Sequence, residues 1–162
     1  YVEIAGSDRE DKVYPYIKKY AKHHELNGNH GMNWPIYRYA EVLLFLAETL
    51  NEQGKTAEAA GYLNQIRERA GLAATTVSSQ GDMREAIFKE RRVELAFENK
   101  RWFDIVRADR VQEIIGDFGQ RALANPLDYY YPAGATFRSN AFTNITKYYA
   151  LPAAEAEITP HF

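Results

Sequence analysis

The chain has 162 residues, of which 46% are hydrophobic and 26% charged, a composition that can bury a core and differs from that of disordered proteins. A net charge of -2 offers no basic surface for nucleic acid, and the lack of cysteine excludes disulfides, thiolate zinc sites and cysteine nucleophiles. Twelve tyrosines are the one compositional hint of a binding surface.

Residues 1–35 have little periodic pattern and predict an irregular lead-in. His23, His24 and His30 fall in a stretch rich in Gly and Asn, which is typical of a polar loop. Their spacing matches neither a helical His pair nor a zinc motif, so we expect no metal site. No apolar run is long enough to span a bilayer.

The next stretch predicts two helices joined by a glycine turn. Apolar residues recur at helical spacing over 36–53, where Gly54 ends the pattern, and again over 55–70, where Gly71 ends it. The pair occupies about 34 residues, the length of a tetratricopeptide unit. Two antiparallel helices with small residues at Ala47 and Ala59 would fit such a unit.

A second helical hairpin is expected over 83–115. Asp82 is a candidate N-cap, the first helix runs to Glu98, and a break at Asn99 and Lys100 precedes a second helix over 101–115. Charged residues of this segment share a stripe with Met83 and Ile87 instead of lying opposite them.

Charges placed among apolar residues predict partly buried ion pairs between helices, because a lone buried charge is costly. Arginines of the first hairpin, including Arg69, are the expected partners of the glutamates. The predicted structural ion network consists of Arg38, Arg67, Glu90, Arg91, Glu94, Glu98 and Arg101. The alternative is a solvated helix with pairs four residues apart.

Beyond Gly116 the chain is rich in Pro, Gly, Asn and aromatic residues, which predicts an irregular loop and tail over 117–162. Aromatic rings can stack on sugar rings, and the candidate ligand-binding residues are Trp34, Tyr129, Tyr130, Tyr131 and Phe137. The alternative is that these rings seal the helical bundle.

Catalysis is not expected. The chain contains no Gly-rich phosphate loop, no GxSxG and no HExxH sequence. Its clustered carboxylates are interleaved with arginines. Neighbouring arginines lower the pKa values of carboxylates, and a carboxylate with a lowered pKa is a poor general acid. No cofactor is expected either, so binding is the remaining class of function.

Three segments in the same order resemble the SusD/RagB-like outer-membrane glycan-binding lipoproteins. The first consists of RYAEVLL at 38–44, Ala47-Glu48 and NQIRERAGL at 64–72, and the second is ERRVELAFENKRWFDIVR at 90–107. The third is a closing segment over 148–160, which departs from the family pattern at Ala153 and Thr159.

The resemblance implies an all-α fold of tetratricopeptide-like helical hairpins followed by an irregular wrapping segment. Residues 1–162 would form a single domain, the C-terminal portion of a larger protein, with a lead-in over 1–35, hairpins over 36–116 and a loop and tail over 117–162.

It also implies a non-catalytic, cell-surface outer-membrane lipoprotein that binds oligosaccharides and delivers them to a SusC-like TonB-dependent transporter. The lipid anchor would lie upstream of this chain and provide its only membrane contact. This part would be mainly scaffold and transporter contact. A helical-repeat adaptor that binds a protein or peptide without binding sugar remains the alternative.

Overall fold

The structure is a computed structural model that describes residues 2–3, 13–14, 17–20, 35–129, 131, 135–137, 142–143, 145–148 and 152. The chain divides into two compact units, residues 1–98 and 99–162. The described part is all-α apart from one short strand pairing, which confirms the predicted fold class. The assignment to a single domain stays a prediction.

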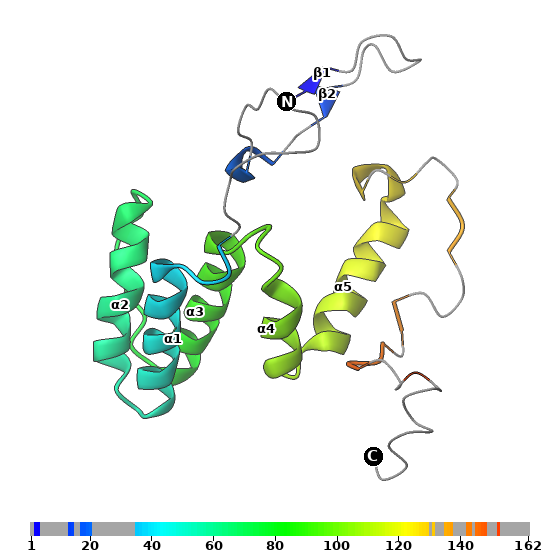
Figure 1. Cartoon of the computed structure of the whole chain (residues 1–162). Coiled ribbons are helices and arrows are strands. Elements are labelled where there is room, and N and C mark those ends of the chain that lie inside the picture. The colour runs from blue at the N-terminus through cyan, green and yellow to red at the C-terminus, as the bar shows by residue number, and fades with distance from the viewer. Residues whose placement is uncertain are drawn as a thin grey trace. The chain divides into compact units, whose positions relative to one another are not determined.

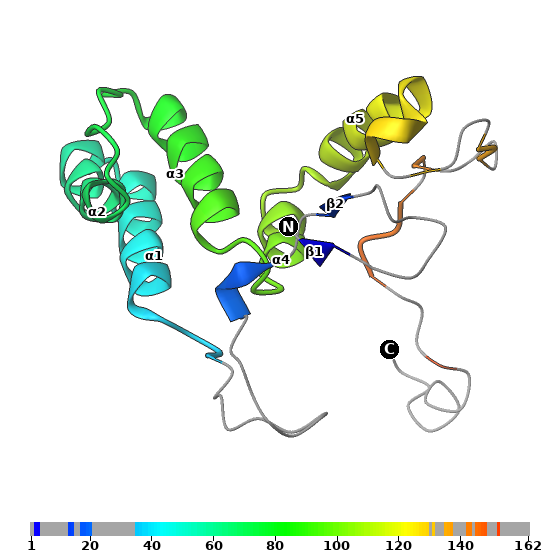
Figure 2. The same cartoon turned by 90° about the horizontal axis from the view of Figure 1, so that it is seen from above.

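Three helices form the first unit: α1 (Tyr39–Glu52), α2 (Thr56–Arg69) and α3 (Gln80–Glu94). Both views show α1 lying against α2 and α3 (Figures 1 and 2). Their shared core consists of Leu43, Leu44, Ala47, Ala59, Leu63, Ile66, Met83, Ile87 and Leu95. The apolar periodicity of the sequence therefore identifies the inward faces of the helices correctly.

The described residues of the lead-in form three short elements. β1 (Val2–Glu3) pairs antiparallel with β2 (Val13–Tyr14), and Val2 lies opposite Tyr14. A 3-10 turn, η1 (Lys18–Tyr20), follows. These elements matter for the site because η1 carries Lys19.

Glycine ends α1 and α2 as predicted. Gly54 and Gly71 have φ angles of 78° and 74°, a left-handed conformation that glycine adopts without a steric penalty. The Lys55 amide donates to the Leu50 carbonyl, and the Leu72 amide donates to the Arg67 carbonyl, both at the position of a Schellman motif. Both turns are thus fixed by local sequence.

The starts of α1 and α3 differ from the prediction. α1 begins at Tyr39 instead of residue 36, because Arg38 is extended, with φ -139° and ψ 160°. α3 begins at Gln80, so Asp82 is not its cap. Ser79 is the N-cap: its Oγ accepts from the Asp82 amide at 3.1 Å and donates to the Asp82 carboxylate at 2.7 Å.

The second unit contains α4 (Arg101–Arg107), α5 (Val111–Ala124) and the 3-10 turn η2 (Pro126–Tyr129). The predicted continuous helix over 101–115 is wrong, because Asp109 is left-handed, with φ 57°, and the Arg110 amide closes a Schellman motif on the Ile105 carbonyl. Asparagine and aspartate adopt this conformation more readily than other residues with a side chain.

The predicted irregularity from residue 117 is also wrong at its start, since α5 continues to Ala124. Val111 and Ala122 are fully buried and Ile115 and Phe118 half-buried, and together they form one face at helical spacing. Gly116 lies inside this helix, where burial of the apolar face outweighs the cost of glycine.

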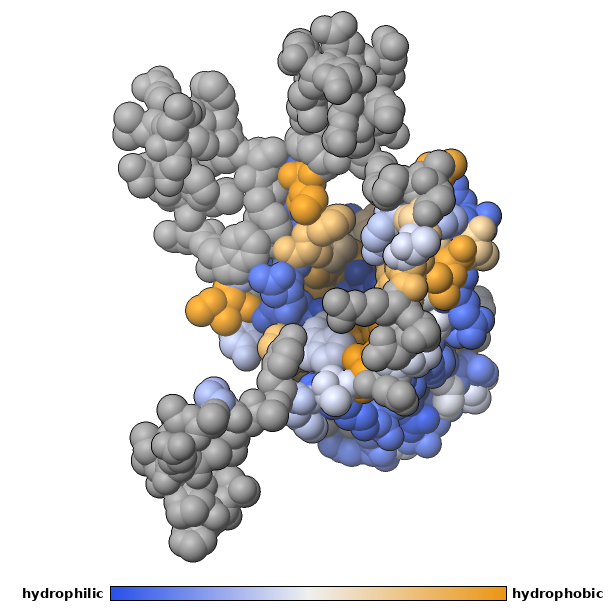
Figure 3. Space-filling view, turned by 90° about the vertical axis from the view of Figure 1, so that its right-hand side faces the viewer, coloured by the Kyte–Doolittle hydropathy of each residue, from blue (hydrophilic) through white to orange (hydrophobic). Residues whose placement is uncertain are grey.

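Hydrophobic residues are not confined to the core. The space-filling view shows several orange groups at the surface beside blue hydrophilic ones (Figure 3). Among the described residues, no helix has the length and apolar character needed to cross a bilayer.

Candidate functional site

Arg38 lies at the centre of a charged cluster in the first unit. Its Nε donates to both carboxylate oxygens of Glu98 at 2.9 Å, its Nη1 donates to Glu94 Oε1 at 2.5 Å, and its Nη2 donates to the Glu94 carbonyl at 2.5 Å. The extended residue before α1 is thereby tied to the end of α3. Arg38 and its partners are at least half-buried, so the interaction is more than a solvated surface pair.

Two further cations contact the same carboxylates. Arg69, at the end of α2, donates from Nη2 to Glu94 Oε1 at 2.5 Å. Lys19 from η1 forms an ion pair with Glu98 and donates to the carbonyls of Glu94 and Ala96. Three cations therefore surround two carboxylates, and four separate elements of the sequence meet here.

The cluster shifts the pKa values of Glu98 and Arg38. Burial tends to raise the pKa of Glu98, but hydrogen bonds from Arg38 and Lys19 outweigh burial and lower it. Burial likewise tends to lower the pKa of Arg38, and its hydrogen bonds with Glu98 and Glu94 raise it instead. Both groups are held in their charged forms, which suits a framework and does not suit a general acid.

Two other ion pairs with buried carboxylates join the helices. Arg67 Nη1 donates to Glu90 Oε2 at 2.9 Å, and Arg67 Nε donates to the Ala73 carbonyl, so this arginine links α2, α3 and the connector. Arg91 Nη2 lies 3.6 Å from Glu41 Oε1, with both side chains no more than 3% exposed. The Arg91 guanidinium also lies 4.7 Å above the Phe45 ring centre, a cation–π contact.

The structure thus groups six of the seven predicted network residues into three sets of ion pairs, not one continuous network. The seventh, Arg101, lies at the start of α4 in the second unit. Sequence reasoning missed Glu41 and Lys19. Glu41 could have been found, because it lies on the same helical face as the buried Ala40 and Leu44. Lys19 lies in a stretch without periodic pattern.

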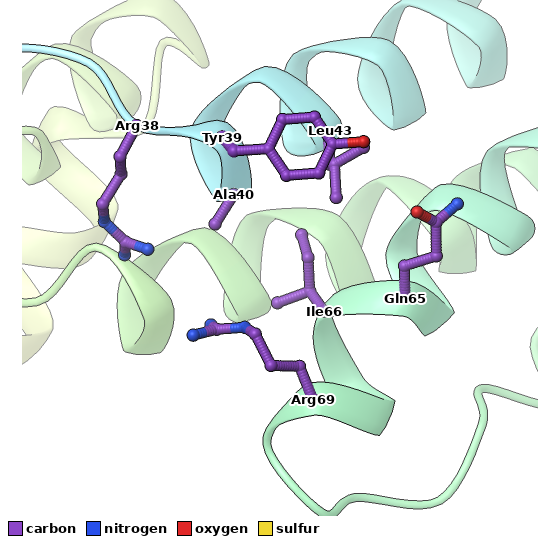
Figure 4. Close-up of a pocket in the computed structure, with 7 residues that line it drawn as sticks. All are labelled: Arg38, Tyr39, Ala40, Leu43, Gln65, Ile66 and Arg69. Carbon is purple, nitrogen blue, oxygen red and sulfur yellow. The ribbon is translucent and has the colours of Figure 1, made fainter.

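A cavity of about 360 Å³ lies between α1 and α2, next to the charged cluster. Figure 4 shows Tyr39 beside Leu43 and Ile66, with Arg38 and Arg69 on one side and Gln65 on the other. Its floor is apolar and its charged end is formed by arginines already bound to Glu94. The two arginines nearest the cavity are thus already engaged in ion pairs with Glu94 at the end of α3.

The aromatic candidates fall into two groups. Trp34 and Tyr130 lie outside the described residues. Tyr129 meets Phe118 of α5 edge-on, with ring centres 5.2 Å apart, and Tyr131 meets Phe137 edge-on at 5.0 Å. Phe142 contacts both Phe118 and Phe137. These five rings, Tyr129, Phe118, Phe142, Phe137 and Tyr131, form a chain of contacts that we call the aromatic cluster.

The aromatic cluster is half-buried and its polar atoms are partly used. Arg121 Nε donates to the Tyr129 hydroxyl at 3.3 Å, and Phe142 packs directly on the backbone of Gly119. Gln112 donates to the Ile145 carbonyl, and Lys147 forms an ion pair with Asp109. These contacts fasten the described part of the tail to the α4–α5 elbow.

Metal binding has no support in the described residues, which contain no group of three His, Asp or Glu side chains arranged to hold an ion. His23, His24 and His30 lie outside the described residues.

Comparison with known proteins places the chain. The model of the SusD family matches residues 5–160. The chain belongs to the SusD family. The recognition made from the three sequence segments is therefore confirmed, and SusD-family proteins are non-catalytic binding proteins.

Among individual SusD-family relatives, SusD-like protein P2 of Formosa agariphila is 42% identical over 118 residues, which cover 65% of this chain and 23% of that protein. SusD-like protein P38 of the same organism is 33% identical and covers 59% of this chain and 22% of that protein. A crystal structure of a SusD-like protein from Bacteroides fragilis is 44% identical over half of this chain and 16% of that one, with a TM-score of 0.49. The chain therefore spans less than a quarter of the length of these relatives.

Proposed function

We propose that this SusD-family chain is part of an outer-membrane, cell-surface lipoprotein that binds oligosaccharides without modifying them and delivers them to a SusC-like TonB-dependent transporter. The observation that carries the proposal is the family match over residues 5–160. In such a protein a lipid anchor would provide the membrane contact.

Within such a protein we assign this chain mainly to scaffold and transporter contact. Its most constrained side chains, Arg38, Glu94 and Glu98, are engaged with one another across α1, α2 and α3. Side chains already held by ion pairs are poorly suited to exchange partners with a neutral sugar, and well suited to fix helix positions.

The full-length protein tests the function. Isothermal titration calorimetry against a panel of oligosaccharides should give saturable binding, and affinity purification from outer membranes should recover a SusC-like transporter. A protein that binds peptides and no sugar, while retaining the transporter, would change the ligand class. Failure of both experiments would favour the helical-repeat adaptor.

Two of the five aromatic candidates can be tested in the same protein. Trp34→Ala and Tyr131→Ala should each weaken oligosaccharide binding if the ring contacts the sugar, at an unchanged unfolding temperature. A lower unfolding temperature with unchanged affinity would assign Tyr131 to packing, the role that its edge-on contact with Phe137 supports. Phe103→Ala, at an exposed ring outside the aromatic cluster, is the control.

A further inference from the structure

The cavity between α1 and α2 has an apolar floor and a cationic end. Ala40, Leu43 and Ile66 form the floor, and the volume of about 360 Å³ lies in the range of sites for small organic ligands. Figure 4 shows the guanidinium groups of Arg38 and Arg69 on the same side of the cavity. A ligand that fits this cavity would present an apolar face to the helices and a negative charge to the arginines.

The cationic end carries one positive charge more than its carboxylates neutralise. Within the described part of the chain, three cations, Lys19, Arg38 and Arg69, form ion pairs only with Glu94 and Glu98. Each of the other buried carboxylates described in the first unit has an arginine of its own. The local excess of positive charge therefore favours an anion at this end of the cavity.

Arg69 is the arginine that has donors left for such an anion. Arg38 uses Nε, Nη1 and Nη2 on Glu94 and Glu98, whereas Arg69 donates to described residues only from Nη2. The Arg69 side chain is 59% exposed, so Nε and Nη1 can bind a ligand while Nη2 stays on Glu94. A hydrogen bond from arginine to a carboxylate is charge-assisted and about twice as strong as a neutral one.

The exposed ring of Tyr39 indicates the shape of the ligand. Tyr39 is 73% exposed and lies beside Leu43 and Ile66, where its flat face is open to contact the C–H face of a sugar ring. Gln65, on the side away from the arginines, has an amide that can donate to or accept from a hydroxyl. An aromatic face, an amide and an arginine together match a sugar ring that carries a carboxylate.

We propose that the cavity between α1 and α2 binds a uronate unit of an acidic oligosaccharide. The proposal rests on the proposed oligosaccharide-binding function and narrows its ligand to one chemical class. Tyr39 packs on the sugar ring, Gln65 bonds a hydroxyl, and Arg69 binds the carboxylate. The ion pairs of the charged cluster stay intact, so the same residues hold the helices and the ligand.

Isothermal titration calorimetry on the full-length protein tests the proposal with matched ligands. The probes are an oligogalacturonide and its methyl ester, which differ in the charge of the carboxylate. The acid should bind at least about tenfold more tightly than the ester, the effect of one charge-assisted hydrogen bond. Added salt should weaken binding of the acid and leave binding of the ester unchanged.

Variants locate this binding in the cavity. Arg69→Gln should reduce the affinity for the acid to that for the ester, and Tyr39→Ala should weaken both ligands by a similar factor. Arg84→Gln is the matched control, because Arg84 is a similarly exposed arginine that also holds a glutamate but lies outside the cavity lining. Unfolding temperatures show whether each variant is folded. Tyr39→Ala keeps the test decisive if Arg69→Gln disturbs Glu94.

Equal affinities for the acid and the ester would overturn the proposal, as would an affinity for the acid that Arg69→Gln and Tyr39→Ala leave unchanged. In either case a neutral oligosaccharide that binds would preserve the proposed function. Binding of a glutamate-rich peptide instead of the uronate, with loss of binding in Arg69→Gln, would also overturn it by making the cavity a peptide site. Absence of binding to any sugar would overturn both proposals.

Discussion

Arg38 forms ion pairs with both Glu94 and Glu98, so its removal should weaken the joint between the residue before α1 and the end of α3. Arg38→Ala would leave Glu94 and Glu98 with fewer cations in a half-buried setting. We expect the free energy of unfolding to fall by about 2–3 kcal/mol, between the values for exposed and fully buried pairs. Urea unfolding measures this change.

Arg84→Ala is the matched control. Arg84 also donates two hydrogen bonds to one carboxylate, that of Glu52, each at 2.7 Å. The side chains of Arg84 and Glu52 are, however, about half exposed. Water screens such a pair, so the control should lose far less stability than Arg38→Ala. Equal losses would show that burial of the Arg38 cluster contributes nothing.

Glu98 makes the stability of the first unit depend on pH. Its pKa is lowered below the ordinary value of 4.5 in the folded protein, so its contribution is fully present above pH 4.5 and is lost as the pH falls through the folded pKa. We expect the unfolding temperature to drop below pH 4.5, and Glu98→Gln to make that drop shallower. Scanning calorimetry between pH 3 and pH 7 is the measurement.

Glu52→Gln provides the comparison for this pH effect. The pKa of Glu52 is also lowered, mainly by the hydrogen bond from Arg84, but Glu52 is exposed. Its replacement should change the pH dependence of the unfolding temperature less than Glu98→Gln does. If Glu98→Gln left that pH dependence unchanged, Glu98 would not contribute to the loss of stability in acid.

The glutamates at the helix joints could be predicted because they share a helical stripe with apolar residues. A charged side chain in such a position needs an oppositely charged partner, since an unpaired buried charge is costly. Glu41 was missed although it lies on the same helical face as the buried Ala40 and Leu44, where a charge also needs a partner. Lys19 was missed because its position depends on where an unpatterned lead-in meets α3, and residue spacing carries no information about that distance.

At the scale of the elements, Ser79 has the clearest local role. Its hydroxyl caps α3 and exchanges hydrogen bonds with Asp82. Ser79→Ala should lower the free energy of unfolding by about 1 kcal/mol, while the neighbouring exposed Ser78→Ala should have little effect. Urea denaturation of the two variants compares them directly, and a similar small loss in both would mean that the cap is unimportant.

Helices α1 and α2 could be predicted closely because periodicity and a terminal glycine agree at Gly54 and Gly71. The α4–α5 elbow could not, because Asp109 takes the left-handed position that glycine usually marks. Gly116 produced the opposite error, since a glycine inside a helix has the same sequence appearance as one that ends it. A glycine alone does not show whether a helix ends there or continues. Over 111–122 the apolar face that continues past Gly116 shows that the helix continues.

At the scale of the whole molecule, family membership could be predicted from three ordered segments because their residues fix the helix joints. The ligand could not be predicted. The half-buried aromatic cluster has the same composition whether it contacts sugar or packs against α5, so the sugar-binding role of its tyrosines stays a prediction.

The chain as a whole exposes an apolar helix face while carrying a net charge of only -2, which gives little electrostatic repulsion between copies. We therefore expect the 162-residue chain, produced alone, to self-associate as its concentration rises. Val42→Glu together with Leu46→Glu should shift it toward monomer, as measured by sedimentation velocity.

The control for that shift is Leu72→Glu together with Leu123→Glu, which adds the same charge at exposed leucines away from α1. If added charge alone kept the copies apart, both double variants would become monomeric to the same extent. If the exposed apolar residues of α1 cause the association, only the α1 variant should become monomeric, because burial of their apolar area drives the contact. A monomeric unsubstituted chain at high concentration would contradict the prediction.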